Sequence, residues 1–390
     1  MVQYNPFSEE VMRDPHPIYK QMRKEAPVYH IEEYDAWALS KFDDIWACSM
    51  DAKHFSAAQG TTSAHLLTKV QPVTPMLNLM DPPQHTQLRS QMRHHFTPAA
   101  IGKLEPVIRE VARTNLEAAL ERGELDVMSD LASKVSVTVA CMVTGIPLED
   151  TEHMNDLVWR FFGREPGVDG MTADGLAAME EMFGYFAQLS EKRRVEGDRD
   201  DLVSLLNNVE IDGQKLDTAS IASHISLLII GGSETLPKVF ASAVQWLGEH
   251  PDQRAEVAAN PELVPNAFLE VLRYDMPTQF LCRTVTNEIE IRGKKLKPGQ
   301  PVLYLYPSAN RDEDEFENPD SFDVKRQIPR LLSFGHGTHL CLGIHAAKLE
   351  GRVLIEELLA KRPEYQLDLA RSERLVTDFV QGYASLPVTF

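Results

Sequence analysis

The fold is decided by the stretch Phe334-Gly335-His336-Gly337-Thr338-His339-Leu340-Cys341-Leu342-Gly343, which precedes an amphipathic segment over residues 344–361. Two glycines in three positions predict a backbone that bends where a Cβ would hinder it. The periodicity of residues 344–361 predicts a helix, so Cys341 lies near a helix N-terminus. Free N–H groups and the helix dipole favour a thiolate there, which can bind a metal or attack an electrophile. For a lone Cys-x-Gly, a buried turn cysteine would be the simpler interpretation.

The composition is that of a globular protein with an acidic balance. The chain has 390 residues, and 39 Lys and Arg against 58 Asp and Glu give a net charge of −19. Such a chain is a poor general binder of nucleic acid. Residues 1–10 lack the pattern of a signal peptide, and the longest apolar run, residues 227–230, is too short to span a bilayer. We therefore expect a soluble, cytoplasmic protein without a membrane anchor.

The four cysteines, Cys48, Cys141, Cys282 and Cys341, are widely spaced and form no C-x-x-C pair. This spacing argues against a zinc ribbon and against a disulfide framework. Cys48 and Cys141 lie in apolar surroundings and are predicted to be small core residues. Only Cys341 lies in a sequence pattern that predicts a chemical role.

The first third of the chain contains one candidate cationic face. Alternation over residues 28–42 predicts short strands, and residues 56–78 predict a loop region. Asp81-Pro82-Pro83 then predicts a helix start with Asp81 as the cap. His85 and Arg89 are four residues apart on that helix and share a face. The spacing alone favours a solvated basic face.

Helical periodicity dominates residues 101–209, with Ser129 or Asp130 as a candidate cap and an end near Gly145. Residues 163–175 carry four glycines and a proline and predict a mobile connection between two helices. Its flanks hold aromatic and methionine side chains that at helical spacing favour a core role, namely Trp159, Phe161, Phe162, Met179, Met182, Phe183, Tyr185 and Phe186.

A further long helix is predicted to open at Asp217 or Thr218 and contains Gly231-Gly232-Ser233-Glu234-Thr235-Leu236-Pro237. Glycine costs about 1 kcal/mol in a helix interior and proline about 3 kcal/mol. We therefore expect this helix to bend or break. The simpler interpretation is the end of one helix and the start of another.

The last third of the chain predicts a helix opened by Pro265, which carries Glu270 and Arg273 on one face, followed by short strands. Residues 280–284 and 302–306 predict strands, and residues 288–297 predict a hairpin around Gly293. The residues from 365 onward predict a final hairpin with its tip near residues 380–384.

Together these segments resemble the cytochrome P450 family, because residues 334–343 match its haem-ligand signature, Phe-Gly-x-Gly-x-His-x-Cys-x-Gly, at every fixed position. The resemblance implies a mainly α, single-domain fold over residues 1–390 with small β-sheets. It places haem b, with Cys341 as its iron ligand, between a long kinked helix and the helix after the cysteine loop.

The resemblance also implies roles for particular residues. Thr235 and Glu234 match the acid–alcohol pair of the oxygen-binding groove, although Gly231 replaces the usual Ala and Leu236-Pro237 follows where small or hydroxylated residues are common. Glu270, Arg273 and Arg326 match a buried ionic triad. The implied haem-binding residues are His85, Arg89, Arg283, Phe334, Gly335, His339, Cys341 and Gly343, and the implied substrate-pocket residues are Gly231, Gly232, Phe280 and Leu281.

The expected function is hydroxylation of an apolar small molecule by a monomeric haem-thiolate monooxygenase. No G-x-G-x-x-G follows a strand and the cysteines are too few for an iron–sulfur segment, so electrons have to come from a separate protein. The resemblance implies a ferredoxin with an NAD(P)H-dependent reductase. Two alternatives remain open, a peroxide-driven peroxygenase and a non-catalytic haem-thiolate ligand binder or sensor. The sequence leaves the substrate itself open.

Overall fold

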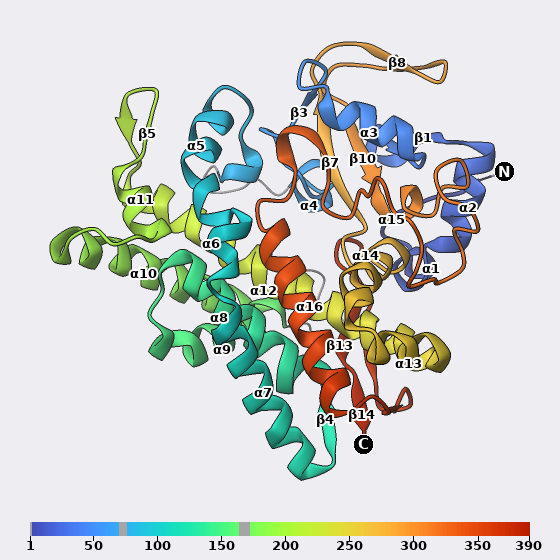
Figure 1. The fold of residues 1–390 in the computed structure, drawn as a ribbon. Helices are drawn as coiled ribbons and strands as arrows, with labels where there is room; N and C mark the ends of the chain where they lie inside the picture. The colour runs from blue at the N-terminus through green and yellow to red at the C-terminus, as the bar shows by residue number, and fades with distance from the viewer. Residues whose placement is uncertain (1, 70–75, 164–171) are drawn as a thin grey trace.

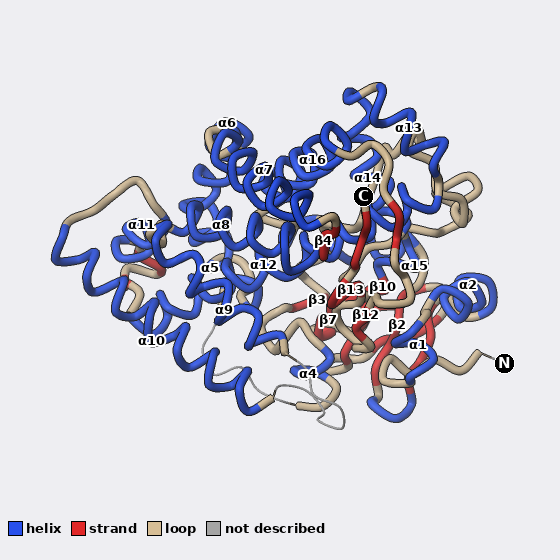
Figure 2. Tube along the Cα trace, turned by 90° about the horizontal axis from the view of Figure 1, so that it is seen from below, coloured by secondary structure: helices blue, strands red, loops and turns tan. Residues whose placement is uncertain are grey.

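The computed structural model describes residues 2–69, 76–163 and 172–390, and its architecture is mainly helical with small sheets, as expected. Helices α5 to α12 and α16 form one side of the molecule, while the largest sheet and the N-terminal helices form the other (Figure 1). Figure 2 shows the same division from below. The helices are α1 Glu9–Arg13, α2 His16–Glu25, α3 Phe42–Met50, α4 Ser63–Leu66, α5 Gln84–Met92, α6 Pro98–Gly102, α7 Glu105–Arg122, α8 Ser133–Thr144, α9 Thr151–Phe162, α10 Ala173–Glu196, α11 Leu202–Asn208, α12 Thr218–Glu249, α13 Pro251–Ala259, α14 Val264–Tyr274, α15 Tyr306–Ala309 and α16 Ile344–Lys361.

The largest sheet has the strand order β1-β2-β10-β7-β3, in which β10 pairs parallel with β2 and the other pairs are antiparallel. Its strands are β1 Val28–Ile31, β2 Ala36–Leu39, β3 Phe55–Ser56, β7 Phe280–Val285 and β10 Pro301–Leu305. The smaller pairings involve β4 Glu124–Asp126, β5 Glu210–Ile211, β6 Gln214–Lys215, β8 Ile289–Ile291, β9 Lys294–Leu296, β11 Gln366–Leu367, β12 Glu373–Leu375, β13 Gly382–Ser385 and β14 Pro387–Thr389.

Helix α12 is the central element of the helical side. It packs against α8, α10, α16 and β13, and most of its side chains are buried. The carboxylate of Asp217 accepts a hydrogen bond from the backbone N–H of Ser220, which confirms Asp217 as its cap. The helix continues through Pro237, so the interpretation as two successive helices is wrong. Packing on several sides compensates for the lost backbone hydrogen bond.

Two helical segments, Val127–Thr144 and Thr218–Glu249, are apolar and long enough to cross a membrane by composition alone. Neither contains a long uninterrupted apolar run, so the run length in the sequence does not reveal them. Of their most apolar windows, 72% and 61% is buried inside the fold. Their apolar character is therefore explained by packing against other helices.

Several local expectations at helix ends are wrong. Asp81 does not cap α5, because its carboxylate accepts hydrogen bonds from the Ser56 hydroxyl and the Ala57 N–H beside β3. Asp126, rather than Ser129 or Asp130, caps the helical turn that leads into α8, accepting from the N–H groups of Met128 and Ser129. Which residue caps each helix depends on the hydrogen-bond partners that the fold brings near each carboxylate. Helix-cap propensity contains no information about these partners.

The loop expected over residues 56–78 contains the short helix α4, and the C-terminal region is more than one hairpin. There, β12 pairs with β13, whereas β14 pairs with both β11 and β4. The tip of the β12–β13 pair bridges the chain just before β7 through Val380 and Thr278. Most of the glycine-rich connection expected over residues 163–175 lies outside the described residues, and α10 already begins at Ala173.

Candidate functional site

The loop before α16 is shaped by two glycines in left-handed conformations. Gly335 has φ 67° and Gly337 has φ 69°. A Cβ at Gly337 would lie 2.3 Å from the carbonyl oxygen of Ser49, at the end of α3, so only glycine allows this approach. The N–H of Cys341 donates to the carbonyl of Phe334 at 2.8 Å and closes the loop. The backbone therefore holds Cys341 in one place just before α16.

Of the four cysteines, all of which the structure describes, Cys341 alone is exposed. Burial still raises the pKa of its thiol, while the N–H of Gly343 and the charge of Arg89 act in the opposite direction. Burial raises the pKa of Cys48 and Cys141 to about 12 and raises that of Cys282 as well, so these three remain thiols. Cys48 and Cys141 pack in the hydrophobic core, as predicted.

Four side chains with N–H donors gather near this loop from three separate segments. His85 and Arg89 come from α5, Arg283 from β7 and His339 from the loop itself. The rings of His85 and His339 lie 4.3 Å apart between centroids, and Arg89 donates to the carbonyl of Leu340. The sequence positions are up to 254 residues apart (339 − 85 = 254), so only the tertiary fold brings them together.

Three of these four side chains, His85, Arg89 and Arg283, have unsatisfied donor capacity. His85 is buried, yet neither ring nitrogen has a hydrogen-bond partner among the described residues. Within the described part of the chain, Arg89 and Arg283 form no ion pair with a carboxylate. Burial and the charge of Arg89 lower the pKa of His85 to about 4, and burial followed by the charge of Arg283 lowers that of His339 to about 3. An anionic group bound here would pair the arginines and relieve both histidines.

The middle of α12 has an open face within an otherwise buried helix. Gly231 and Gly232 are exposed and Thr235 is partly exposed, whereas the adjacent Ser233 and Leu236 are buried. Positions 231, 232 and 235 share one face of a helix. A Cβ at Gly231 would meet no described atom within 4 Å, so the replacement of the family's usual Ala by Gly leaves this face open.

Glu234 points toward the next turn of α12. Its Oε1 lies 3.3 Å from the Nζ of Lys238, and both side chains are largely buried. The sequence-based reasoning did not single out Lys238, although the i,i+4 spacing of the two residues could have found it. Thr235, on the open face, and Glu234, in the ion pair, thus occupy different sides of the same turn.

The two predicted substrate residues on β7 lie in different environments from the open face of α12. Phe280 is buried in a core cluster with Tyr19, Met22 and Leu303 from the N-terminal side of the molecule. Leu281 is partly buried and packs against a second core cluster, which contains Leu39, Val302 and Tyr304 of the largest sheet. Phe280 is therefore a core residue and does not line exposed surface.

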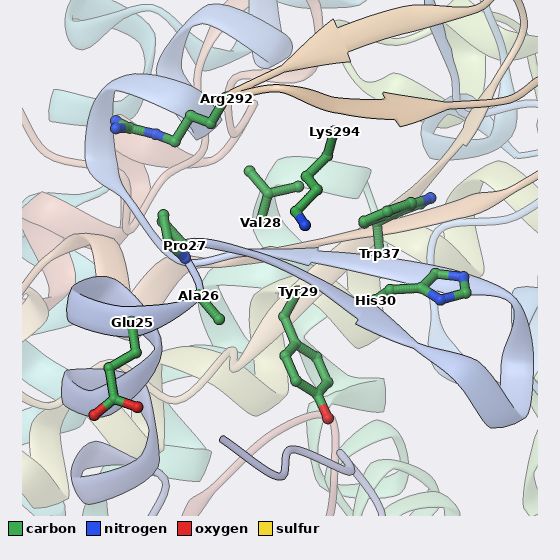
Figure 3. Close-up of a pocket in the computed structure, with 9 residues that line it drawn as sticks. All are labelled: Glu25, Ala26, Pro27, Val28, Tyr29, His30, Trp37, Arg292 and Lys294. Atoms are coloured by element: carbon green, nitrogen blue, oxygen red, sulfur yellow. The ribbon is translucent and has the colours of Figure 1, made fainter. Parts of the chain in front are cut away.

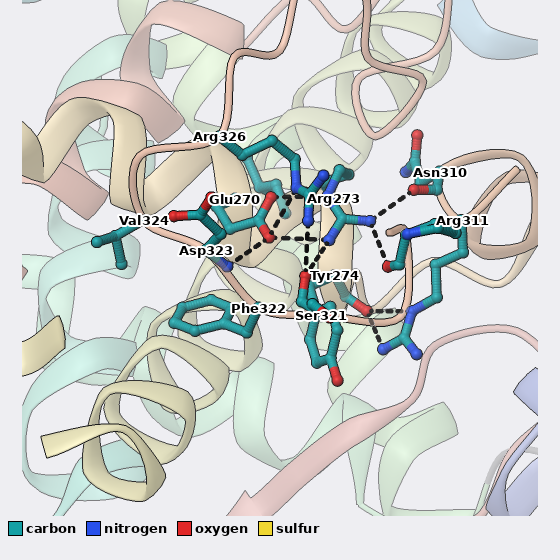
Figure 4. A network of polar contacts seen from close by, with 12 residues as sticks. Glu270, Arg273, Tyr274, Asn310, Arg311, Ser321, Phe322, Asp323, Val324 and Arg326 are labelled. Atoms are coloured by element: carbon teal, nitrogen blue, oxygen red, sulfur yellow. Dashed lines mark hydrogen bonds and ion pairs between the residues drawn. The ribbon is translucent and has the colours of Figure 1, made fainter. Parts of the chain in front are cut away.

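Glu270, Arg273 and Arg326 form one buried ionic network (Figure 4). The Glu270 carboxylate lies 2.6 Å from Nε of Arg273 and 3.2 Å from Nε of Arg326. Arg273 also donates to the backbone carbonyls of Asn310, Pro319 and Ser321. The network thus fixes the segment that leads from α15 toward the cysteine loop, which is a structural task.

A separate surface groove of about 390 Å³ lies between β1, β2 and the β8–β9 hairpin (Figure 3). It contains none of the predicted site residues, and it is lined by Glu25, Ala26, Pro27, Val28, Tyr29, His30, Trp37, Arg292 and Lys294. Arg292 is already paired with Asp44. The chemistry of the cysteine loop is therefore elsewhere in the molecule.

Comparisons with known proteins find relatives over nearly the whole chain. A family model described as cytochrome P450 matches residues 173–362. Putative cytochrome P450 123 of Mycobacterium tuberculosis is 34% identical over 99% of this chain and 96% of its own. Vitamin D(3) 25-hydroxylase of Pseudonocardia autotrophica is also 34% identical, over 99% of this chain and 96% of its own. The solved structure of cytochrome P450 CYP109Q5 from Chondromyces apiculatus has a TM-score of 0.88 at 28% identity, covering 100% of this chain and 98% of that one.

Proposed function

This chain belongs to the cytochrome P450 family of haem b monooxygenases, and we propose that it hydroxylates an apolar small molecule with electrons from a separate ferredoxin. The observation that carries the site assignment is that His85, Arg89 and Arg283, which have unsatisfied donor capacity, gather with His339 near the exposed Cys341. Haem b has two carboxylates and an iron that accepts a thiolate, so its chemistry fits these residues. We also propose that residues 1–390 act as one domain, as a cytoplasmic monomer.

In this proposal each residue near the loop has one task. Cys341 ligates the iron, and the N–H of Gly343 stabilises its sulfur. His85, Arg89, Arg283 and His339 bind the two propionates, with Arg suited to a carboxylate by its planar fork. Phe334, beneath the ammonium of Lys348, limits the access of water to the ligand loop. The bound haem supplies the activation of dioxygen.

In the middle of α12, two side chains would transfer protons, Thr235 and Glu234. The Oγ1 of Thr235 holds a water by hydrogen bonding on the open face of the helix. The Glu234 carboxylate accepts a proton from the solvent side and passes it on toward that water. Gly231 and Gly232 leave space beside Thr235 for the substrate. Positioned proton transfer of this kind contributes about 10²–10⁴-fold to a rate.

The apolar substrate is supported by the side chains of α9 and α10 and by one relative. Met182 and Phe186 are buried there, with Phe161, Phe162 and Phe183 packed beside them. The relative named vitamin D(3) 25-hydroxylase acts on an apolar molecule. Arg160, a candidate partner for a substrate carboxylate, forms ion pairs with Asp174 and Glu181 instead.

A turnover comparison tests this function. With ferredoxin, its reductase, NAD(P)H and dioxygen, we expect hydroxylated product from those members of an apolar library that shift the ferric spin state. Thr235→Ala is expected to lower the product formed per NAD(P)H about tenfold or more and to raise peroxide release, because the proton path is lost. Turnover with hydrogen peroxide alone would instead favour the peroxygenase. Spin shifts without any product would favour the ligand binder or sensor.

The ferredoxin is expected to dock on cations near the cysteine loop. Arg93, Lys103 and Lys348 are exposed, and among the described residues they form no ion pair with a carboxylate. Arg352 and Arg330 of the same region are already paired, Arg352 with Glu105 and Glu356, and Arg330 with Asp43 and Glu315. Arg93, Lys103 and Lys348 therefore provide the net positive charge that would attract an acidic partner.

Charge reversal tests the docking surface. The double variant Arg93→Glu/Lys348→Glu is expected to slow ferredoxin-dependent reduction about tenfold at low salt and to flatten its salt dependence, because electrostatic steering is lost. Stopped-flow reduction measures this rate. Arg13→Glu on α1, where Arg13 is paired with Glu9, is the control and should leave it unchanged. An unchanged rate in the double variant would contradict this docking surface.

A further inference from the structure

Lys238 is a buried cation beside the proposed proton path. It lies one helical turn beyond Glu234 on α12 and is 5% exposed. Its Nζ is 3.3 Å from the Oε1 of Glu234 and 3.4 Å from the backbone carbonyl oxygen of the same residue. A buried ammonium is stable only when it is paired and well packed. Both of these oxygen atoms belong to Glu234, so the ammonium is paired with that residue.

The fold encloses Lys238 from two further elements. Gly382 of β13 has φ +137°, and a Cβ built there would lie 3.0, 3.2 and 3.3 Å from Cβ, Cγ and Cδ of Lys238. The glycine thus lets the strand press against the lysine stem. At the other end, the ring centroid of Phe162, the last residue of α9, lies 5.7 Å from Nζ. This distance is within the range of a cation–π interaction.

The enclosure restricts where the ammonium can go. A solvated lysine samples many rotamers, and an exposed i,i+4 pair with glutamate contributes little. Here the stem is confined by β13 and the ammonium by Phe162, so the cation is held in position. A fixed cation in turn fixes the carboxylate that it binds, because a buried charge pair loses stability when its geometry is disturbed.

We propose that Lys238 is a positioning residue for proton delivery, holding the Glu234 carboxylate on the turn of α12 that carries Thr235. This inference rests on the proposed role of Glu234. Lys238 keeps its own protons throughout. Glu234 accepts one proton from the solvent side and releases it toward the water held by Thr235, and it returns to the same ion pair afterwards. The ion pair thus returns the Glu234 carboxylate to the position from which it can accept the next proton.

The first measurement is independent of turnover. In the ferric holoenzyme labelled with ¹⁵N-lysine, Lys41 should give a slowly exchanging ammonium signal, because it is buried and paired with Asp312 and Asp314. For the same reason we expect a second slowly exchanging signal, from Lys238. Lys238→Met and Glu234→Gln should each remove it. Lys192→Met is the matched control, since Lys192 and Glu196 form an exposed i,i+4 pair at 3.8 Å. Persistence of the Lys238 signal in Glu234→Gln would overturn the pairing.

The second measurement is product formed per NAD(P)H. Lys238→Met is expected to lower it about tenfold, and Lys238→Arg, which keeps the cation, should recover most of that loss. In a Glu234→Gln background, Lys238→Met should have no further effect, because Lys238 acts through Glu234. An equal loss in both backgrounds, or wild-type coupling in Lys238→Met, would overturn the inference. If Glu234→Gln alone changes nothing, the proposed role of Glu234 fails first.

Discussion

Replacing Cys341 by alanine is expected to abolish the red-shifted Soret band of the reduced, carbon monoxide-treated protein and to reduce turnover to background. The reason is that a thiolate ligand pushes electron density onto the iron, and no other cysteine can supply it. Cys48, Cys141 and Cys282 are buried in β-sheet or helix cores with raised pKa values. An absorption spectrum of the variant measures this directly.

Cys48→Ala is the matched control for this prediction. It removes a thiol near the end of α3, close to the cysteine loop. This thiol lies in a core cluster with side chains of the largest sheet. Its spectrum should retain the red-shifted band. If the band persists in Cys341→Ala, or disappears equally in Cys48→Ala, the ligand assignment is wrong.

Replacing Arg273 by methionine is expected to lower the free energy of unfolding by about 3–5 kcal/mol, because the buried Glu270 then keeps only Arg326 as a charged partner. Both Glu270 and Arg273 are completely buried, and three backbone carbonyls lose a donor at the same time. Denaturant unfolding measures the change. Since the network fixes the segment before the cysteine loop, we also expect lower haem incorporation.

The control for Arg273 is an exposed ion pair. Arg13→Met removes a cation paired with Glu9 on α1, where both side chains are mostly exposed. Exposed pairs contribute little, so its unfolding midpoint should barely change. A similarly small change in Arg273→Met would show that the network is not needed for stability.

The segments with strong local patterns were predicted well. The helix expected over residues 344–361 has these same bounds, and the β8–β9 hairpin forms around Gly293 as expected. Helix α12 begins at the predicted place, with Asp217 as its cap and Thr218 as its first residue. In each of these cases the signal is carried by residues only a few positions apart, so the sequence contains all of it.

Predictions failed where distant segments decide the outcome. Asp81 has the right identity and position for a helix cap, but Ser56 and Ala57 compete for its carboxylate. Pro237 has the right identity for a helix break, but α12 is held on several sides by other elements.

The sequence alone determined the family, and it singled out the cysteine and the proposed haem-binding segments, because the cysteine motif is a short string with demanding spacing. The tertiary structure decided how those segments meet. It gathered His85, Arg89, Arg283 and His339 beside Cys341, and it placed Lys238 against Glu234 between β13 and α9. The physical reason is that burial and charge pairing depend on neighbours in space, and a linear pattern records only neighbours along the chain.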